Sequence, residues 1–368
     1  MKERDKILDS LKGISILGIV LVHSKAAGDL PIIAGQIKAM GATGTIVFML
    51  ISVYLMLSSY EKMVMLGNDT YIKWFVSKLL RMAPMYWLFL ALRLFLGGYG
   101  NQAIIGNAIT HFFFINSLFP TFANSLLDVE WFVGALVFFY LITPIMYKVF
   151  DNATKAFCGL LVTSSIALIL NHVCVNHLFN NVAGDKQYSY EAWIGGWFPP
   201  VLLDVYCAAM IWFWLAKKKN IIADISEQTR KLLSFSLLTL FIILFVADTI
   251  GEFRVWGISS RLISVFTYLL LITALYIHPN KLIVNNVWAF VGKYTYGIFL
   301  SHIMIINMIF KIPVCLSNVL LDWIVKYFTS LCGAIIVSVV LTELFERPIL
   351  KLLKISRKNR LIKKNTIV

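Results

Sequence analysis

Long apolar runs separated by short polar connections make up most of the chain. A helix needs about 20 mostly apolar residues to cross a bilayer, and ten runs approach or exceed that length. We expect them at residues 7–25, 41–60, 80–97, 131–150, 156–178, 196–216, 231–249, 259–279, 289–310 and 322–346. The pattern therefore predicts an all-α, polytopic membrane bundle of about ten transmembrane helices.

A further apolar run, at 103–119, carries polar side chains at Asn107, His111 and Asn116. The hydrocarbon core of a bilayer excludes irregular backbone that faces lipid. We therefore expect a re-entrant or interfacial helix here, within the long connection at 98–130.

Basic residues are distributed unevenly over the predicted connections. If the N-terminus lies inside the cell, the inner loops and tails contain most of the Lys and Arg residues, including the run at 217–219. Cytoplasmic loops normally carry this excess. The charge pattern predicts that both termini are cytoplasmic, with one membrane domain at 1–348 and a basic cytoplasmic tail at 349–368.

The composition agrees with an integral membrane protein. Hydrophobic residues make up 59% of the chain, charged residues 14%, and the mean hydropathy is +0.80, whereas a soluble domain carries about 25% charged residues. The net charge of +14 does not indicate nucleic-acid binding, because the basic residues lie in short loops beside the bilayer. The sequence has no phosphate-binding P-loop, dinucleotide fingerprint or zinc-protease helix, and we expect no metal.

The first apolar run carries a Lys near its start and a His near its end. Lys12 and His23 are separated by about three turns plus 20° of helix, so their side chains share one face. The helical rise places His23 about 16 Å beyond Lys12. Because ionisable groups are costly in hydrocarbon, such a pair indicates a functional site. We infer a cation at the cytoplasmic mouth and a general base, His23, toward the outer half.

Two more charged pairs lie at the ends of predicted spans. Lys78 and Arg81 share a face at the cytoplasmic entrance of the third run, where they could bind phosphates; simple anchoring at the membrane surface is the alternative. Asp128 and Glu130 lie at the outer end of the fourth run. They could orient His23 or contact sugar hydroxyls, and ordinary loop acids are the alternative.

The ninth run contains a second intramembrane histidine, His302, for which hydrogen bonding or packing is the alternative to function. Glu346 and Arg347, near the cytoplasmic end of the last run, are expected to tie the bundle together. The outer connection at 180–195 combines Tyr, Trp, Asp and Glu residues, which suits a carbohydrate. An interfacial aromatic belt is the alternative there.

Taken together, these segments resemble the acyltransferase-3 family of multi-spanning membrane acyltransferases. The resemblance rests on Asp9-Ser10-Leu11-Lys12-Gly13, followed after ten residues by His23, and on Phe75-x-x-Lys78-x-x-Arg81-Met82-x-Pro84-x-Tyr86-Trp87. It continues in Trp131-Phe132-Val133 with Tyr140 and Pro144, in Tyr296 to His302 and in Glu346-Arg347-Pro348. The motifs keep the family order over nearly the whole chain.

The resemblance implies an O-acyltransferase of a bacterial cytoplasmic membrane. It would take an acyl group, most simply acetyl, from cytoplasmic acetyl-CoA. It would place this group on a hydroxyl of an extracytoplasmic polysaccharide, such as O-antigen or capsule, or of its lipid-linked precursor. The resemblance implies no nucleic-acid partner.

The resemblance also assigns roles to individual residues. The implied donor contacts are Lys12, Lys78, Arg81 and Tyr86, and the implied catalytic base is His23. We expect Trp131 and His302 to contact the acceptor. Many family members carry an acidic residue where this chain has Leu136. The acidic partner of His23 is therefore unassigned, and Glu130 is a candidate.

Two other classes of function stay open at the level of sequence. A lipid-linked glycan exporter or a proton-coupled transporter could use His23 and Glu130, although many transporters carry internal repeats and none is evident here. A non-catalytic membrane scaffold would leave Lys12 and His23 replaceable without effect.

Overall fold

The computed structural model describes residues 5–67, 70–96, 101–179, 185–217, 225–250, 260–312 and 316–353. Within these ranges every regular element is a helix. Seven helices are long and apolar enough to cross a membrane, and up to eight if one bent pair counts as a single span. The all-α membrane bundle is therefore confirmed, while the predicted count of ten spans is not.

The helices follow the apolar runs closely. The N-terminal part contains α1 (Lys6–His23), α2 (Ile32–Met40), η1 (Gly41–Thr43), α3 (Gly44–Leu66), α4 (Tyr71–Leu96), α5 (Asn101–Phe112) and η2 (Asn116–Leu118). The middle contains α6 (Trp131–Val149), α7 (Ala153–Val173), η3 (Cys174–Leu178), α8 (Asp185–Ala192), η4 (Trp193–Trp197), η5 (Pro199–Leu202) and α9 (Leu203–Ala216). The C-terminal part contains α11 (Glu227–Ile250), α12 (Ser260–Ile277), α13 (Asn286–Lys293), α14 (Thr295–Phe310), α15 (Val319–Leu341) and η7 (Thr342–Glu346).

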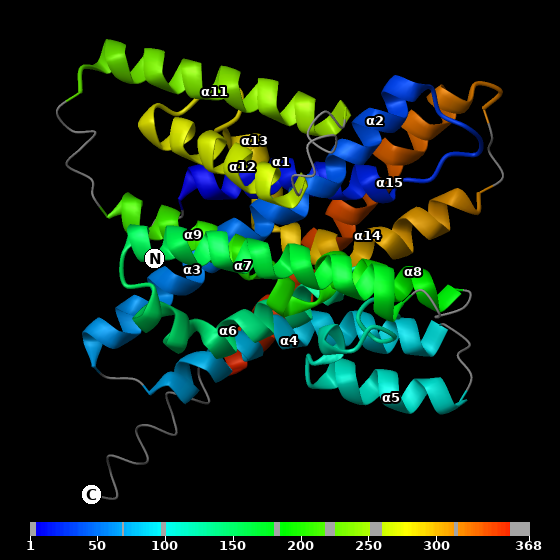
Figure 1. Ribbon diagram of the computed structural model, residues 1–368. Coiled ribbons are helices and arrows are strands. Elements are labelled where there is room, and N and C mark those ends of the chain that lie inside the picture. The colour runs from blue at the N-terminus through cyan, green and yellow to red at the C-terminus, as the bar shows by residue number, and fades with distance from the viewer. Residues whose placement is uncertain are drawn as a thin grey trace, which may run out of the picture.

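The polar-interrupted run at 103–119 forms the short helix α5 and the single turn η2, not a span. With 12 residues, α5 is about 18 Å long, which is less than the roughly 30 Å of a hydrocarbon core. Figure 1 shows α5 at one end of the bundle, beside the end of α4. This agrees with an interfacial helix.

The helix α1 runs through the interior of the bundle and contacts α13, α3 and α14. Its residues Ile16, Ile19 and Val20 are fully buried. The crossing with α13 is so close that a Cβ atom on Gly292 would lie 1.8 Å from the carbonyl oxygen of Asp9. Small residues permit such backbone contacts between membrane helices, and this crossing fixes the position of the Lys12 end of α1.

The predicted span at 289–310 is not one continuous helix. It is broken at Tyr294 into α13 and α14, which are bent by 74°. Ser338 of α15 donates a hydrogen bond to the carbonyl oxygen of Tyr294 (2.6 Å). A backbone break inside a membrane protein is tolerated where another helix satisfies the freed polar groups. The predicted run at 289–310 is therefore formed by a bent pair of helices.

The beginning of α1 and the end of the last long helix lie at the same end of the bundle (Figure 1). Asp5 accepts a hydrogen bond from Tyr276 at the end of α12 (2.5 Å). Lys293 pairs with Glu343 just beyond α15 (3.6 Å). The assignment of this end to the cytoplasm stays a prediction. The predicted basic tail is helical to residue 353, and residues 354–368 lie outside the described part.

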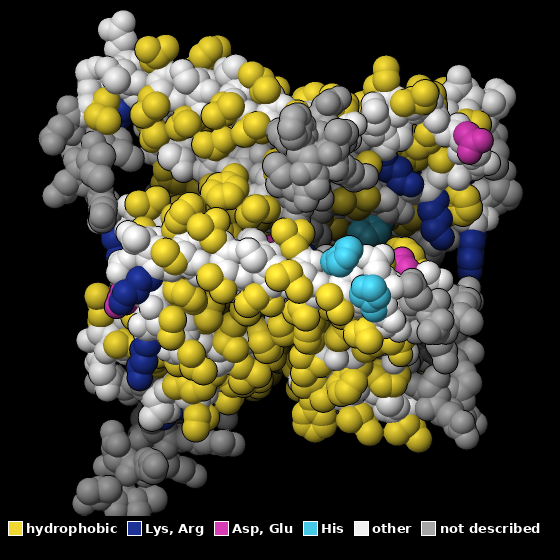
Figure 2. Space-filling model, in the orientation of Figure 1, with side chains coloured by type: hydrophobic (Ala, Val, Ile, Leu, Met, Phe, Trp, Pro, Cys, Tyr) yellow, Lys and Arg dark blue, Asp and Glu magenta, His cyan; other side chains and the backbone are white. Residues whose placement is uncertain are grey.

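The surface of the bundle is apolar where α7 and α11 face outward. Figure 2 shows hydrophobic side chains over both helices, including exposed Phe157 and Ile169 on α7 and exposed Phe235 and Ile243 on α11. A soluble protein rarely exposes an apolar patch of this extent. This surface fits contact with lipid.

Candidate active site

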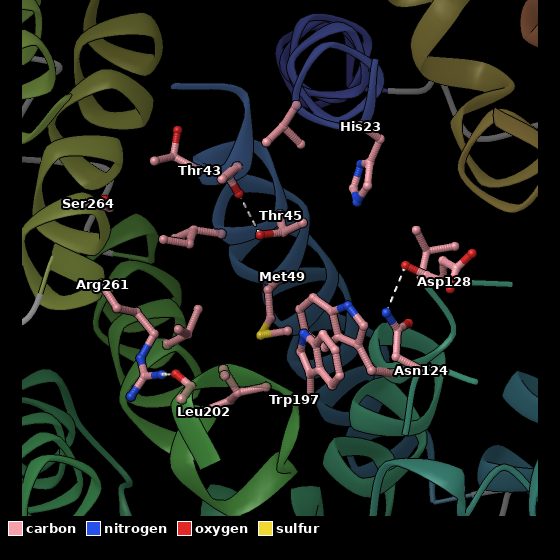
Figure 3. A pocket seen from close by; sticks show the side chains of 18 of the residues that line it. His23, Thr43, Thr45, Met49, Asn124, Asp128, Trp197, Leu202, Arg261 and Ser264 are labelled. Atoms are coloured by element: carbon pink, nitrogen blue, oxygen red, sulfur yellow. Dashed lines mark hydrogen bonds between the residues drawn. The ribbon is translucent and has the colours of Figure 1, made fainter. Parts of the chain in front are cut away.

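A cavity of about 810 Å³ lies at the end of the bundle where α1 terminates. Its walls come from the end of α1, η1 with the start of α3, the segment at 120–131, the turns from α8 to η5, and the facing ends of α11 and α12. Figure 3 shows side chains from these elements pointing into one space. The cavity collects hydroxyl, amide, carboxyl and indole groups, which is a lining suited to a polar ligand.

His23 is the last residue of α1, and its ring points into the cavity (Figure 3). Its Nδ1 lies 2.8 Å from the carbonyl oxygen of Ile19. Because a carbonyl oxygen only accepts, Nδ1 carries the proton and Nε2 keeps its lone pair. A histidine in this tautomer can accept a proton from a hydroxyl at Nε2.

His302 on α14 lies directly behind His23. Its Nδ1 donates to the carbonyl oxygen of Phe299 (2.7 Å), so its Nε2 is an acceptor. That Nε2 is 3.5 Å from Nδ1 of His23, and the two rings meet edge to face with centroids 5.2 Å apart. The sequence predicted His302 as an acceptor contact. It is fully buried, is not among the cavity-lining residues, and contacts His23 instead.

Glu130 does not reach His23 in the described structure. Its carboxylate accepts hydrogen bonds from the backbone N–H groups of Leu126, Leu127 and Val129, at 2.6 to 3.0 Å. Its Oε1 also lies 3.3 Å from Nε2 of His111 on α5. The geometry thus gives Glu130 the role of holding the segment before α6. It offers no support for the predicted catalytic partnership with His23.

Trp131, which the sequence predicts as an acceptor contact, lines the cavity, and its role stays a prediction. Trp197 from η4 lines the cavity as well (Figure 3). Asp128 lies at the rim, where the side-chain amide of Asn124 donates to its carbonyl oxygen (2.9 Å). Although Asp128 is exposed, desolvation by the surrounding segment and the negative charge of Glu130 raise its pKa.

The three predicted phosphate-binding cations are not part of this cavity. Lys12 pairs with Asp9 (3.9 Å). Lys78 donates a hydrogen bond to Ser59 of α3, and the exposed Arg81 is one turn further along α4. All three are near the end of the bundle where α1 begins, so the structure separates the cationic end from the histidine end along the length of α1.

Tyr86, predicted as a donor contact, lies between these two ends. Its side chain is fully buried, and its ring stacks on Phe114 with centroids 5.0 Å apart. Its hydroxyl has no hydrogen-bond partner within the described ranges. A buried hydroxyl without a partner is unfavourable, so this position is one where a bound ligand could supply a hydrogen bond.

Sequence reasoning missed the part of the cavity formed by α9, α11 and α12. Arg261 and Asp248 line it, and Asp204 pairs with Arg261 through Oδ2 and Nε (2.9 Å). The available signal was the presence of ionisable residues within or beside apolar runs, since such residues are costly in a bilayer.

Comparison with known proteins agrees with this architecture. The acyltransferase-3 family, described as an acyltransferase domain, matches residues 5–343. A protein of Acidianus two-tailed virus named "Putative acetyltransferase ORF330" is 23% identical over 319 residues, covering 86% of this chain and 88% of the viral protein. No solved structure matches the chain significantly. Because the family match spans nearly all of the chain, this membrane-spanning protein belongs to the acyltransferase-3 family and is an acyltransferase.

Proposed function

We propose that the protein transfers an acetyl group from acetyl-CoA, bound at the Lys12, Lys78 and Arg81 end, to a hydroxyl of a glycan held in the cavity at His23. The acceptor is a surface polysaccharide or its lipid-linked precursor at a bacterial cytoplasmic membrane. The proposal rests mainly on the orientation of His23. Its Nε2 faces a cavity lined with hydroxyl, carboxyl and indole groups.

The proposed chemistry is attack of the acceptor hydroxyl on the thioester carbonyl carbon. His23 accepts the hydroxyl proton at Nε2 while the new C–O bond forms. The C–S bond then breaks, and the same proton is returned to the CoA thiolate. General-base catalysis of this kind typically contributes 10²- to 10⁴-fold in rate.

The charge distribution supports a donor at the opposite end from the acceptor. Lys78 and Arg81 are close enough to interact electrostatically, and Arg81 also interacts with Glu346. Two neighbouring cations with one acid leave net positive charge for the phosphates of CoA, to which Arg binds with two parallel N–H donors. The pantetheine arm would extend along α1 toward His23.

The proposal is tested by the O-acetyl content of surface glycan in the cells that make the protein, measured by mass spectrometry. Cells with the wild-type protein are compared with cells making His23→Ala and cells making none. We expect acetylated glycan only with the wild type. Unchanged acetylation, with unexported glycan accumulating inside cells that lack the protein, would instead indicate the exporter function.

A further inference from the structure

The wall of the cavity away from Asn124 and Asp128 carries a second polar cluster, formed by Arg261, Ser264 and Asp248. Figure 3 shows Arg261 and Ser264 on this side, and Asp248 joins them because Ser264 donates a hydrogen bond to its Oδ2 (2.6 Å). All three line the cavity. We call this set the α11–α12 wall.

Asp248 is the member of the wall that lacks a full set of partners. Its side chain lies in the last turn of α11 and is only 9% exposed. Its Oδ1 has no hydrogen-bond partner within the described part of the chain. An ionised carboxylate accepts several hydrogen bonds, and leaving one oxygen unpaired in a buried place is costly. A ligand hydroxyl that donates to Oδ1 would remove this cost.

Arg261 is electrically balanced within the wall. Its Nε donates to Oδ2 of Asp204 (2.9 Å), and its Nη1 donates to the carbonyl oxygen of Gly195 (2.9 Å). The other carboxylate oxygen of Asp204 accepts from the N–H of Val205 (2.7 Å). Arg261 and Asp204 therefore cancel in charge, while the guanidinium retains N–H donors for an uncharged oxygen.

The charge balance decides what kind of ligand fits. With Arg261 neutralised, Asp248 is an acid of the lining for which no described Lys or Arg forms an ion pair. The rim residue Asp128 adds a second negative charge, which Arg93 and Lys25 offset only in part. A carboxylate or phosphate on the ligand would be repelled, whereas sugar hydroxyls can donate to Asp248 and accept from Arg261. The indoles of Trp131 and Trp197 provide apolar faces on which a sugar ring can pack.

We propose that the α11–α12 wall is the recognition subsite for a neutral sugar, and that Asp248 and Arg261 select against acceptors that carry an acid. The inference deepens the proposed function, because it takes this cavity to be the acceptor site. It assigns the sugar ring to the α11–α12 wall and the indoles, and it assigns the reacting hydroxyl to His23.

The test measures direct binding of glycosides to the purified full-length protein by saturation-transfer NMR, without any acyl donor. The probes are p-nitrophenyl glycosides of glucose, galactose and N-acetylglucosamine, together with the p-nitrophenyl glucuronide. We expect the wild type to bind at least one neutral glycoside saturably and to bind the glucuronide at least about tenfold more weakly. Absence of neutral binding, or equal binding of the glucuronide, overturns the proposal.

The variant Asp248→Asn has nearly the same shape but no charge. It should bind the neutral glycoside about tenfold more weakly and lose most of the discrimination against the glucuronide. Asp151→Asn is the matched control, because Asp151 is exposed at the turn between α6 and α7 and pairs with Lys155 (2.7 Å). It should behave as wild type. If Asp248→Asn binds and discriminates like the control, the proposal is wrong.

Two further variants keep the outcome interpretable. If Asp248→Asn does not fold, Ser264→Ala is the alternative. It retains the carboxylate of Asp248 and frees its Oδ2, so it should bind the glucuronide still more weakly. Unchanged binding of the neutral glycoside and the glucuronide would contradict the subsite. His23→Ala removes only the contact to the reacting hydroxyl, so it should still prefer the neutral glycoside over the glucuronide. If the wild type discriminates between the glycosides but transfers no acetyl group, the proposed function is wrong and the sugar subsite stands.

Discussion

Two histidines of this protein begin from the same local geometry and end in opposite environments. His23 on α1 and His111 on α5 each place Nδ1 against the carbonyl oxygen four residues earlier, at 2.8 and 2.7 Å. For His23, Nε2 then faces the cavity. For His111, Nε2 is fully enclosed and meets Glu130 at 3.3 Å.

The comparison shows that the backbone contact of Nδ1 does not decide which histidine can act as a base, whereas access to Nε2 does. Because Nδ1 of His111 donates its proton to a carbonyl, the contact of its Nε2 with Glu130 needs one further proton, held on either the ring or the carboxyl group. The pair is therefore a closed structural unit. His23 has the same donor contact but presents an open lone pair, so it can take a proton from a substrate.

The largest expected effect comes from removing that lone pair. His23→Ala should lower acetyl transfer by about 10²- to 10⁴-fold, the usual contribution of a general base. The measurement is the rate of CoA release with glycan acceptor, normalised to folded protein by size-exclusion chromatography. A variant that retains activity within a few-fold would place the base elsewhere.

The same comparison predicts a stability effect, not a chemical one, for Glu130→Gln. The glutamine amide would direct a donor toward at least one backbone N–H that now donates to the carboxylate. An unsatisfied buried group costs about 1–3 kcal/mol, so thermal unfolding in detergent should shift downward while activity per folded molecule changes little. Normal stability with lost activity would restore the catalytic role that the sequence suggested for Glu130.

His302 lies between these two cases, because it contacts His23 without lining the cavity. We predict that it positions the ring of His23. His302→Asn retains a donor near the Phe299 carbonyl oxygen but removes Nε2, and a misplaced base costs roughly 10- to 100-fold in rate. The kcat should fall with the KM for acetyl-CoA unchanged.

The matched variant His302→Gln restores an acceptor near the position of Nε2. It should recover part of the rate and of the wild-type pH profile, which a purely structural role would not predict. Equal loss in both variants, with a parallel loss of thermal stability, would make His302 a packing residue.

The sequence was sufficient for the all-α membrane fold and for the motifs that contain His23 and Trp131, because apolar runs and local spacing carry that information. It did not predict the contact between Glu130 and His111, because His111 comes from a helix outside the motifs. The positive φ of Asp128 (62°), two residues before Glu130, is a local backbone feature that no hydrophobic pattern shows.

The missed residues show the same limit. Asp248 and Arg261 come from different helices and belong to no motif, so only the packing of α11 on α12 reveals that they share a wall. The break at Tyr294 was not predicted because apolar runs lie on both sides of the short segment Lys293-Tyr294-Thr295. The sequence therefore identified residues that act through short-range spacing and missed those that act through tertiary contacts.

The smallest predicted effect concerns the end of the bundle opposite His23. Lys78 contacts a neutral partner, Ser59, and no carboxylate among the described residues, so its charge is available to a phosphate. Loss of one charge-assisted hydrogen bond in Lys78→Gln should raise the KM for acetyl-CoA about tenfold, with kcat nearly unchanged. Lys155→Gln is the control, because Lys155 is exposed and already paired with Asp151. If both variants keep the wild-type KM and only Lys78→Gln inserts poorly into membranes, Lys78 is an anchor and the donor is bound elsewhere.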